Sequence, residues 1–530
     1  MKEACGVFAV FAPGRAVAQL TFDGLYSLQH RGQESAGMAV SDGELITVVK
    51  DMGLVSSVFD ERTIECLPGD LAIGHTRYST AGESTWRNAQ PVFRSVGEIG
   101  IALGHNGTLT NTSDLAEENG MLPGVLTTDS DLVVELLSTA IGKMLSGSND
   151  GANTFAGMKS EALVGAQVAG NSSGKPSPAG LLVDNGQPRD RHGMMEAAML
   201  EVLPKLEGAY SFVAMDESHV FGARDPHGFR PLCLGALPAD EGREVGYVLA
   251  SETPALDVVG ARFIREIEPG EIVVIDESGV RSIRLPVDTG QEPHLCIFEF
   301  VYFARPDSML YGTEVHSARR RMGEYLAAEL PIRADMVMGV PDSGVPAAEG
   351  YSKASGIPYG QGLVKNRYIG RTFIAPRQEA RVAGVKRKLN PLRESILGKR
   401  LVVVDDSIVR GTTTKAMVKM LRDGGAEEIH LRISSPPFRW PCYFGIDTPD
   451  KSELLAANMS VAEIADYLGV DSLAYLSLEG LQKAIGVPGG GFCTACLTGE
   501  YPISVEGIAL QRSASLYKPG VPMVDSVGSV

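Results

Sequence analysis

The sequence lacks a long apolar run. A membrane-spanning helix needs about 20 mainly apolar residues, and no such segment occurs. The N-terminus also lacks the basic segment followed by an apolar one that forms a secretory signal. We therefore expect a soluble, cytoplasmic protein with no membrane partner.

Positive charge is scarce too. The chain has 48 Lys and Arg against 65 Asp and Glu, a formal net charge of −17. Because a nucleic-acid-binding protein needs a basic face for the phosphates, we expect no nucleic-acid partner. Only one local segment, from Lys365 to Arg393, is rich in cations.

Cysteine is infrequent, with seven in 530 residues. Disulfide frameworks are typical of short secreted chains, so these cysteines indicate catalysis or metal binding instead. The chain is also too long for one hydrophobic core, which predicts at least two domains.

The most informative segment is LVVVDDSIVRGTTT, residues 401–414. An apolar strand ends at Asp405 and Asp406, a loop of hydroxyl and glycine residues follows, and residues 415–422 have helical spacing. The N-terminus of such a helix suits a phosphate, whereas the two carboxylates suit ribose hydroxyls or a hard cation. Taken alone, two aspartates after a strand could also be a simple turn.

This segment resembles the phosphoribosyl pyrophosphate (PRPP) signature of the type I phosphoribosyltransferases, which have a parallel sheet flanked by helices. The turn PDSG at 341–344 resembles their pyrophosphate turn. The resemblance implies Mg²⁺ at Ser343, Asp405 and Asp406. It implies PRPP binding by Asp342, Ser343, Gly344, Asp405, Asp406, Ser407, Ile408, Val409, Arg410, Gly411, Thr412 and Thr413.

The basic segment lies between these two motifs. It could be a solvated loop or a nucleic-acid patch, but in an acidic chain and beside a pyrophosphate turn we interpret it as a mobile lid over PRPP. KNRYIGRTFI and VKRKLN within it resemble the amidophosphoribosyltransferase family. Lys388 is the first expected pyrophosphate contact, followed by Arg371 and Lys365.

The N-terminal half combines Cys5 with four polar loops, LQHRGQESAGMAV, GHTRYSTAG, HNGTLTN and TDSD. Alone, Cys5 would be an ordinary buried strand residue. Together these segments resemble the glutaminase domain of the N-terminal nucleophile amidotransferases, an αββα sandwich whose mature chain begins with cysteine. A free α-amine, with a pKa of about 7.7 to 8.0, can act as base for its own thiol, so residues 1–4 are expected to be a propeptide.

The same resemblance implies individual roles in glutamine hydrolysis. Cys5 is the expected nucleophile, with Asn106 and the Gly107 N–H as the oxyanion hole. The expected glutamine-binding residues are Arg77 for the α-carboxylate and Asp129 for the α-ammonium, with Arg31, Gly32 and Tyr78 as second choices.

Composition gives approximate domain limits. We expect the glutaminase domain at 5–275, with a flexible Gly, Ser, Asn and Pro-rich insertion at about 142–186. The phosphoribosyltransferase domain is expected at 294–500 and a tail at 501–530. Residues 298–308, rich in aromatics, are expected to begin as a strand.

Three cysteines resemble ligands of a [4Fe–4S] cluster found in one branch of the family: Cys442, Cys493 and Cys496. The fourth cysteine is expected at position 254, which is Pro254 here. Either Cys233, Cys296 or an oxygen ligand such as Asp257 replaces it, or the cluster is absent.

The predicted activity is transfer of ammonia from glutamine to C1 of PRPP, giving 5-phosphoribosylamine, pyrophosphate and glutamate in the first step of purine biosynthesis. Family resemblance adds purine nucleotide feedback and a homotetramer. Two alternatives are another class II glutamine amidotransferase, such as the glucosamine type, and a PRPP-binding regulatory protein. The first needs sugar isomerase domains and the second a DNA-binding module, and neither is recognisable.

Overall fold

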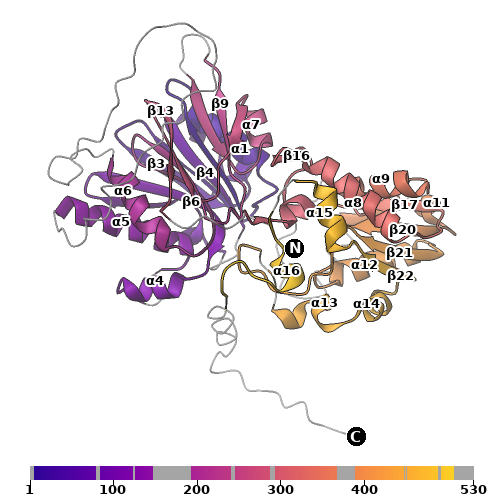
Figure 1. Cartoon of the computed structure of the whole chain (residues 1–530). Helices are drawn as coiled ribbons and strands as arrows, with labels where there is room; N and C mark the ends of the chain where they lie inside the picture. The colour runs from indigo at the N-terminus through magenta and orange to yellow at the C-terminus, as the bar shows by residue number, and fades with distance from the viewer. Residues whose placement is uncertain are drawn as a thin grey trace.

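The computed structural model has two halves, each with its own sheets (Figure 1). None of the helices described is long and apolar enough to cross a membrane. The structure describes residues 5–78, 84–122, 126–146, 193–239, 245–286, 293–366, 388–446, 448, 450–487 and 491–505.

The N-terminal half contains a seven-stranded and a six-stranded antiparallel sheet. The first has the order β11-β9-β10-β1-β4-β2-β3, and the second β13-β12-β8-β7-β6-β5. The strands are β1 (Gly6–Phe11), β2 (Ser35–Ser41), β3 (Ile46–Met52), β4 (Leu71–Arg77), β5 (Val92–Val96), β6 (Ile99–Leu109), β7 (Gly208–Met215), β8 (Val220–Arg224), β9 (Cys233–Leu237), β10 (Gly246–Ala250), β11 (Arg262–Glu266), β12 (Glu271–Asp276) and β13 (Gly279–Arg284).

These two sheets pack face to face between two layers of helices. Side chains alternate along a strand, so Val7 and Ala9 of β1 face the second sheet while Phe8 and Val10 face helices. Helices α1 (Val17–Ser27) and α7 (Pro254–Val258) cover the first sheet; α5 (Asp129–Ser146) and α6 (Met194–Val202) cover the second. Burial on both faces explains the continuous apolar strands, and the expected αββα architecture is confirmed.

The C-terminal half contains a four-stranded parallel sheet of order β17-β20-β21-β22. Val402 and Val404 face one helical layer, and Leu401 and Val403 face the other. This confirms the expected phosphoribosyltransferase architecture. The elements are β17 (Met336–Gly339), β20 (Arg400–Asp405), β21 (Glu428–Ile433), β22 (Ser472–Tyr475), with α8 (Val315–Glu329), α9 (Val345–Ser355) and α15 (Leu478–Ile485) on one face and α12 (Thr412–Asp423) and α14 (Val461–Leu468) on the other.

Shorter elements connect these layers. They are α2 (Val55–Val58), α3 (Glu61–Glu65), η1 (Trp86–Asn88), α4 (Thr112–Glu118), η3 (Leu203–Lys205), β14 (Leu295–Cys296), η4 (Glu299–Phe303), β15 (Met309–Leu310), β16 (Thr313–Glu314), β18 (Leu363–Lys365), β19 (Leu389–Pro391), α11 (Arg393–Ile396), η5 (Lys451–Glu453), α13 (Leu455–Asn458), β23 (Phe492–Cys493) and α16 (Ala495–Thr498).

Three local expectations need correction. Strand β13 pairs with β12, so the second sheet continues to Arg284 rather than ending near Ile275. Residues 142–146 complete α5, and the rest of the expected insertion lies outside the described residues. The aromatic segment after Phe298 forms the π-helical turn η4, not a strand, because Arg319 donates hydrogen bonds to carbonyls at both ends of the turn, Phe300 O at 2.8 Å and Ala304 O at 2.9 Å.

Candidate active sites

Cys5 immediately precedes β1 and is buried. The pairing of Gly6 with Thr76 brings it beside the end of β4. There its thiol lies 3.4 Å from both the backbone N and the O of Tyr78. Burial raises the pKa of the Cys5 thiol, and the Tyr78 contact and Arg77 only partly offset this. The thiol therefore needs a base to react at neutral pH.

Asn106 and Gly107 lie on β6 in the facing sheet. The ring of His75 on β4 contacts His105 O at 2.9 Å, which joins the two sheets next to Asn106. Asn106 is fully buried, and within the described part of the chain neither its Nδ2 nor its Oδ1 has a hydrogen-bond partner. Gly107 has φ +147°, and an added Cβ would lie 2.1 Å from Ala209 O. Unpartnered buried amide atoms are costly, so a ligand is expected to pair with them.

Asp129 is the first residue of α5 and points back to β6. Its carboxylate accepts from Leu109 N at 3.2 Å and Ser130 N at 2.9 Å, and it lies 3.5 Å from His105 Nδ1. Burial alone would raise the pKa of Asp129, but His105 and the backbone donors outweigh it and lower the pKa. A stable buried anion therefore lies in this half, as an α-ammonium contact requires.

Arg31 and Gly32 follow the first helix and have different surroundings. Gly32 lies so close to β4 that a Cβ would be 2.5 Å from Thr76 O. The Arg31 guanidinium is fully buried and bound by Glu252, Glu299 and the Cys5 carbonyl. All three Arg31 nitrogens are thus occupied by protein groups, which favours a structural role over the predicted glutamine contact.

The residues from Asp405 to Thr413 comprise the end of β20, the loop from Asp406 to Gly411 and the start of α12. Ile408 is buried in the core below the loop, and Gly411 has φ +68° as the N-cap of α12. The loop hydroxyls and the free N–H groups of α12 lie at the carboxyl end of the sheet. Burial, together with the charge of Asp406, raises the pKa of Asp405 well above its usual value. A bound cation would relieve that repulsion.

The turn at 341–344 lies beside this loop because β17 and β20 are parallel neighbours. A Cβ on Gly344 would be 2.3 Å from Val404 O, so glycine permits the close approach. Of the predicted lid residues, Lys365 forms an ion pair with Asp342 in the turn. Lys388 lies on the neighbouring segment, where its carbonyl accepts from Asn366 N at 2.8 Å. Arg371 lies outside the described residues.

Comparison with known proteins identifies both halves. The phosphoribosyl transferase domain family matches residues 314–434. An amidophosphoribosyltransferase of Mycobacterium tuberculosis is 48% identical over 517 residues, covering 95% of this chain and 87% of the relative. That of Bacillus subtilis is 42% identical over 510 residues, covering 95% of each chain.

The chain belongs to the amidophosphoribosyltransferase family.

Two solved structures agree with this family assignment. A structure of the allosteric regulatory enzyme of purine biosynthesis is 40% identical with a TM-score of 0.78, covering 94% of this chain and 97% of the other. The glutamine PRPP amidotransferase of B. subtilis, complexed with ADP and GMP, is 40% identical with a TM-score of 0.77, covering 94% and 98%. The predicted amidophosphoribosyltransferase activity, a pentosyl transfer in purine biosynthesis, is confirmed, and the two alternative classes are set aside.

The cysteine arrangement favours one of the alternatives left open for the fourth cluster ligand. Cys296 of β14 pairs in parallel with Cys493 of β23, and Cys442 is close enough to raise the pKa of Cys296. Cys442, Cys296 and Cys493 in turn all raise the pKa of Cys496. Burial raises the pKa of the Cys296 thiol to about 12. Pro254 instead begins α7 in the core outside the first sheet, where Cys233 also packs. The fourth thiol near Cys442, Cys493 and Cys496 is therefore Cys296.

No three His, Cys, Asp or Glu side chains in the described ranges are arranged to hold a single metal ion. A [4Fe–4S] cluster is larger and binds four separated thiolates, so four mutually close, buried thiols match its ligand type. The bonds that thiols make to such a cluster require deprotonation, and the nearby Arg230 lowers the pKa of Cys296 against the effect of burial.

Several charged residues are buried in the structure although no motif of the sequence indicates their role. Glu299 and Arg230 are fully buried and paired at 3.2 Å between the two halves. Arg230 lies in the family segment GARDPHGFRPL, and Glu299 is a single acid within the aromatic run FEFVYF. An acid inside an apolar run signals a buried ion pair, but its partner cannot be read from sequence.

Proposed function

We propose that Cys5 attacks the side-chain amide of glutamine, and that Asn106 and the Gly107 N–H stabilise the oxyanion that forms. The observation that carries this assignment is the fully buried Asn106 amide, which has no hydrogen-bond partner among the described residues. Asn106 lies on the strand of the facing sheet that His75 contacts, and His75 belongs to the strand paired with the Cys5 segment. Ammonia leaves, and water hydrolyses the resulting thioester to glutamate.

The base in this scheme is the α-amine of Cys5, which requires removal of residues 1–4. These residues lie outside the described ranges. N-terminal sequencing of active enzyme should begin at Cys5, and activity of a chain that keeps Met1 would contradict the assignment. Arg77 and Tyr78 at the end of β4, and Asp129 opposite them, would then bind the amino-acid end of glutamine.

In the C-terminal half, we assign the 5-phosphate of PRPP to the loop from Ser407 to Thr413. Asp405 and Asp406 would bind the ribose hydroxyls and, with Ser343, Mg²⁺. Burial and the neighbouring charge of Asp406 raise the pKa of Asp405, and a cation bound between the two carboxylates would relieve that repulsion, which supports this donor set. When bound, Mg²⁺ supplies positive charge to the pyrophosphate. The backbone of the turn at 341–344 and Lys365 with Lys388 would orient the same group.

Ammonia must reach C1 of PRPP without being protonated in bulk water. We propose an enclosed passage between the sites that forms when the lid, residues 365–388, closes; most of that segment lies outside the described residues. Glutaminase rates measured with and without PRPP test this coupling, and equal rates would contradict it.

The deciding experiment compares two nitrogen donors. We expect Cys5→Ala to lose 5-phosphoribosylamine synthesis from glutamine and to keep synthesis from free ammonia, because only the first needs the thiol. If Cys5→Ala lost synthesis from both nitrogen donors, or from neither, the proposal that the N-terminal half releases ammonia and the C-terminal half uses it would be contradicted.

Further properties remain proposals. We propose domain limits of 5–284 and 294–500, since β13 belongs to the second sheet. A [4Fe–4S] cluster on Cys296, Cys442, Cys493 and Cys496 would join three distant chain segments. The B. subtilis relative was solved with ADP and GMP, which supports purine nucleotide feedback. Gel filtration and assays with AMP and GMP test the tetramer and the feedback; the cytoplasmic location stays a prediction.

A further inference from the structure

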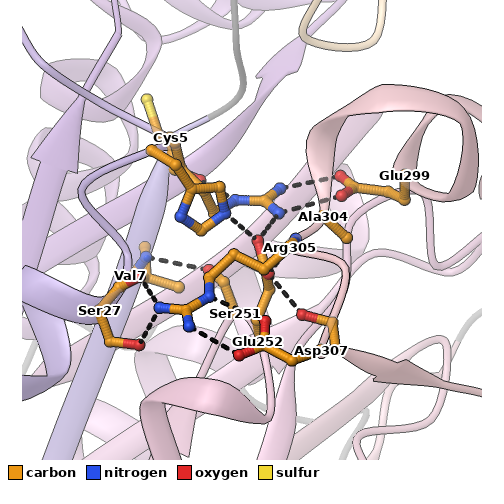
Figure 2. A network of polar contacts seen from close by, with 12 residues as sticks. Cys5, Val7, Ser27, Ser251, Glu252, Glu299, Ala304, Arg305 and Asp307 are labelled. Carbon is orange, nitrogen blue, oxygen red and sulfur yellow. Dashed lines mark hydrogen bonds and ion pairs between the residues drawn. The ribbon is translucent and has the colours of Figure 1, made fainter. Parts of the chain in front are cut away.

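A buried ion-pair network joins the two halves directly behind Cys5 (Figure 2). Glu299 of η4 belongs to the C-terminal half, and both its oxygens bind the Arg31 guanidinium of the N-terminal half, at 3.0 Å and 2.8 Å. Both side chains are fully buried. This two-bond geometry fixes the guanidinium in position as well as in charge.

The other side of Arg31 contacts the nucleophile segment. Its Nε donates to the main-chain carbonyl of Cys5 at 2.9 Å. Glu252 also binds the Arg31 guanidinium. Its carboxylate accepts a hydrogen bond from the backbone N–H of Arg305 at 2.8 Å. Arg31 is thus held by carboxylates and in turn holds the Cys5 backbone, but none of its contacts reaches the thiol itself.

The fully buried charged side chains of the network are two cations, Arg31 and Arg230, and two anions, Glu252 and Glu299. The partly exposed ring of His30 also contacts Glu252, at 2.8 Å. Burial disfavours the charged form of Arg31, but Glu299 and Glu252 outweigh it and raise its pKa above the usual value. Removing Glu299 would take away a buried carboxylate that pairs with both Arg31 and Arg230, which is costly for buried cations.

The η4 turn also lies beside the PRPP loop. Tyr302, three residues after Glu299, has its pKa raised by burial and then by the carboxylates of Asp406 and Asp405. Arg319 of α8 binds the carbonyls at both ends of the same turn. The apolar side chains of this short π-helical turn share one core with Val409 of the PRPP loop, and Glu299 of the same turn binds the glutaminase half.

We propose that Glu299 is a positioning residue for glutamine hydrolysis: through Arg31 it fixes the Cys5 main chain to the half that binds PRPP. The inference rests on the proposed role of Cys5 as nucleophile. It identifies the route by which occupation of the PRPP loop reaches the thiol, since a shift of η4 must move Glu299, Arg31 and then the Cys5 carbonyl.

The test is Glu299→Gln, which keeps the size of the side chain and removes its charge. We expect synthesis from glutamine to fall about 100-fold, because a small displacement of a nucleophile has that effect. Synthesis from ammonia should be unchanged. We expect alkylation of Cys5 by iodoacetamide to depend on PRPP in the parent enzyme and to become independent of PRPP in this variant.

Arg305→Ala is the matched control, because it removes a contact between the same halves, to Ser27 O at 3.3 Å, without touching Arg31 or Cys5. It should keep synthesis from glutamine and its PRPP dependence. If Glu299→Gln is insoluble, Glu299→Gln with Arg230→Met restores the charge balance and is measured instead.

The positioning role would be overturned if Glu299→Gln made 5-phosphoribosylamine from glutamine at the rate of the parent enzyme. It would also be overturned if the rates with glutamine and with ammonia fell equally. Cys5→Ala separates the two proposals. If Cys5→Ala keeps synthesis from glutamine, the proposed nucleophile is wrong; if it loses that activity while Glu299→Gln keeps it, only the positioning role is wrong.

Discussion

At the residue scale, the glutaminase half contains buried polar groups that form no hydrogen bond within the described part of the protein. The two amide atoms of Asn106 are buried without partners, although a buried polar group usually has one. Such a group costs stability in the free enzyme and gains a partner only when a ligand or intermediate is present. Function and stability should therefore respond in opposite ways when it is removed.

Asn106→Ala tests this opposition. We expect synthesis from glutamine to fall roughly 10²- to 10³-fold, the usual effect of losing an oxyanion donor. The free energy of unfolding should not fall, since no hydrogen bond of the free enzyme is lost. Steady-state kinetics and urea unfolding measure the two effects. Ser138→Ala, which removes another buried polar atom that has no partner among the described residues, should leave synthesis unchanged and likewise not lower the free energy of unfolding. A destabilised Asn106→Ala would contradict the argument.

A second prediction at this scale concerns His75, which is fully buried on β4. Burial lowers its pKa to about 3, although the contact with His105 O opposes the shift. At pH values between about 3 and the pKa of about 6.5 that histidine has in the unfolded chain, the unfolded chain binds one more proton than the folded protein. The free energy of unfolding is therefore not reduced by His75 above a pH of about 6.5. Below that pH it falls by about 1.4 kcal/mol per pH unit.

Urea unfolding at several pH values, in the parent and in His75→Gln, measures that contribution. Glutamine keeps a donor for His105 O but does not titrate, so the variant should lose less stability between pH of about 6.5 and about 4. Identical pH dependence in both proteins would show that His75 is not neutral in the folded state.

At the scale of elements, local patterns predicted local structure well. The apolar run ending at Asp405 became β20, and the helical spacing after it became α12. The strand expected after Phe298 was wrong, and the choice among the fourth ligands stayed open, for one reason. Arg319 binds the η4 turn, and Cys296 pairs with Cys493, and both contacts join separate elements. No periodicity in a single sequence reports such contacts.

The loop between β20 and α12 carries its own prediction. Gly411 has φ +68°, and an added Cβ would lie 2.2 Å from Leu455 Cδ1. An alanine in this conformation costs about 1 to 2 kcal/mol and shifts the loop that we assign to the phosphate. We expect Gly411→Ala to raise the KM for PRPP roughly tenfold, which corresponds to about 1.4 kcal/mol, with either nitrogen donor.

Gly398→Ala is the control, since this glycine has φ +67° but nothing within 4 Å of the added Cβ. It carries the same backbone strain outside the loop, so it should lower stability and leave the KM for PRPP unchanged. If Gly411→Ala raises KM with glutamine alone, the loop does not bind PRPP as we propose.

At the scale of the whole molecule, the four thiols lie where the halves meet. Cys296 N donates to Phe229 O of the N-terminal half at 3.1 Å, and Phe444, two residues after Cys442, stacks on the Phe229 ring at 4.4 Å. Arg230 also donates to Phe444 O at 3.0 Å. A cluster bound there would brace the junction that also contains Glu299, so its loss should weaken the contact between the halves.

The prediction at this scale is that Cys296 binds the cluster and Cys233 does not, although both are buried. Enzyme purified without oxygen should contain iron and sulfide, and Cys296→Ser should lose most of both and unfold at a lower temperature, because binding energy at such a site is also folding energy. Cys233→Ser should keep its iron, since that thiol packs outside the first sheet and donates to Ala250 O. Iron in both variants would remove Cys296 from the ligand set, and a colourless, fully active parent enzyme would show that the four thiols serve packing alone.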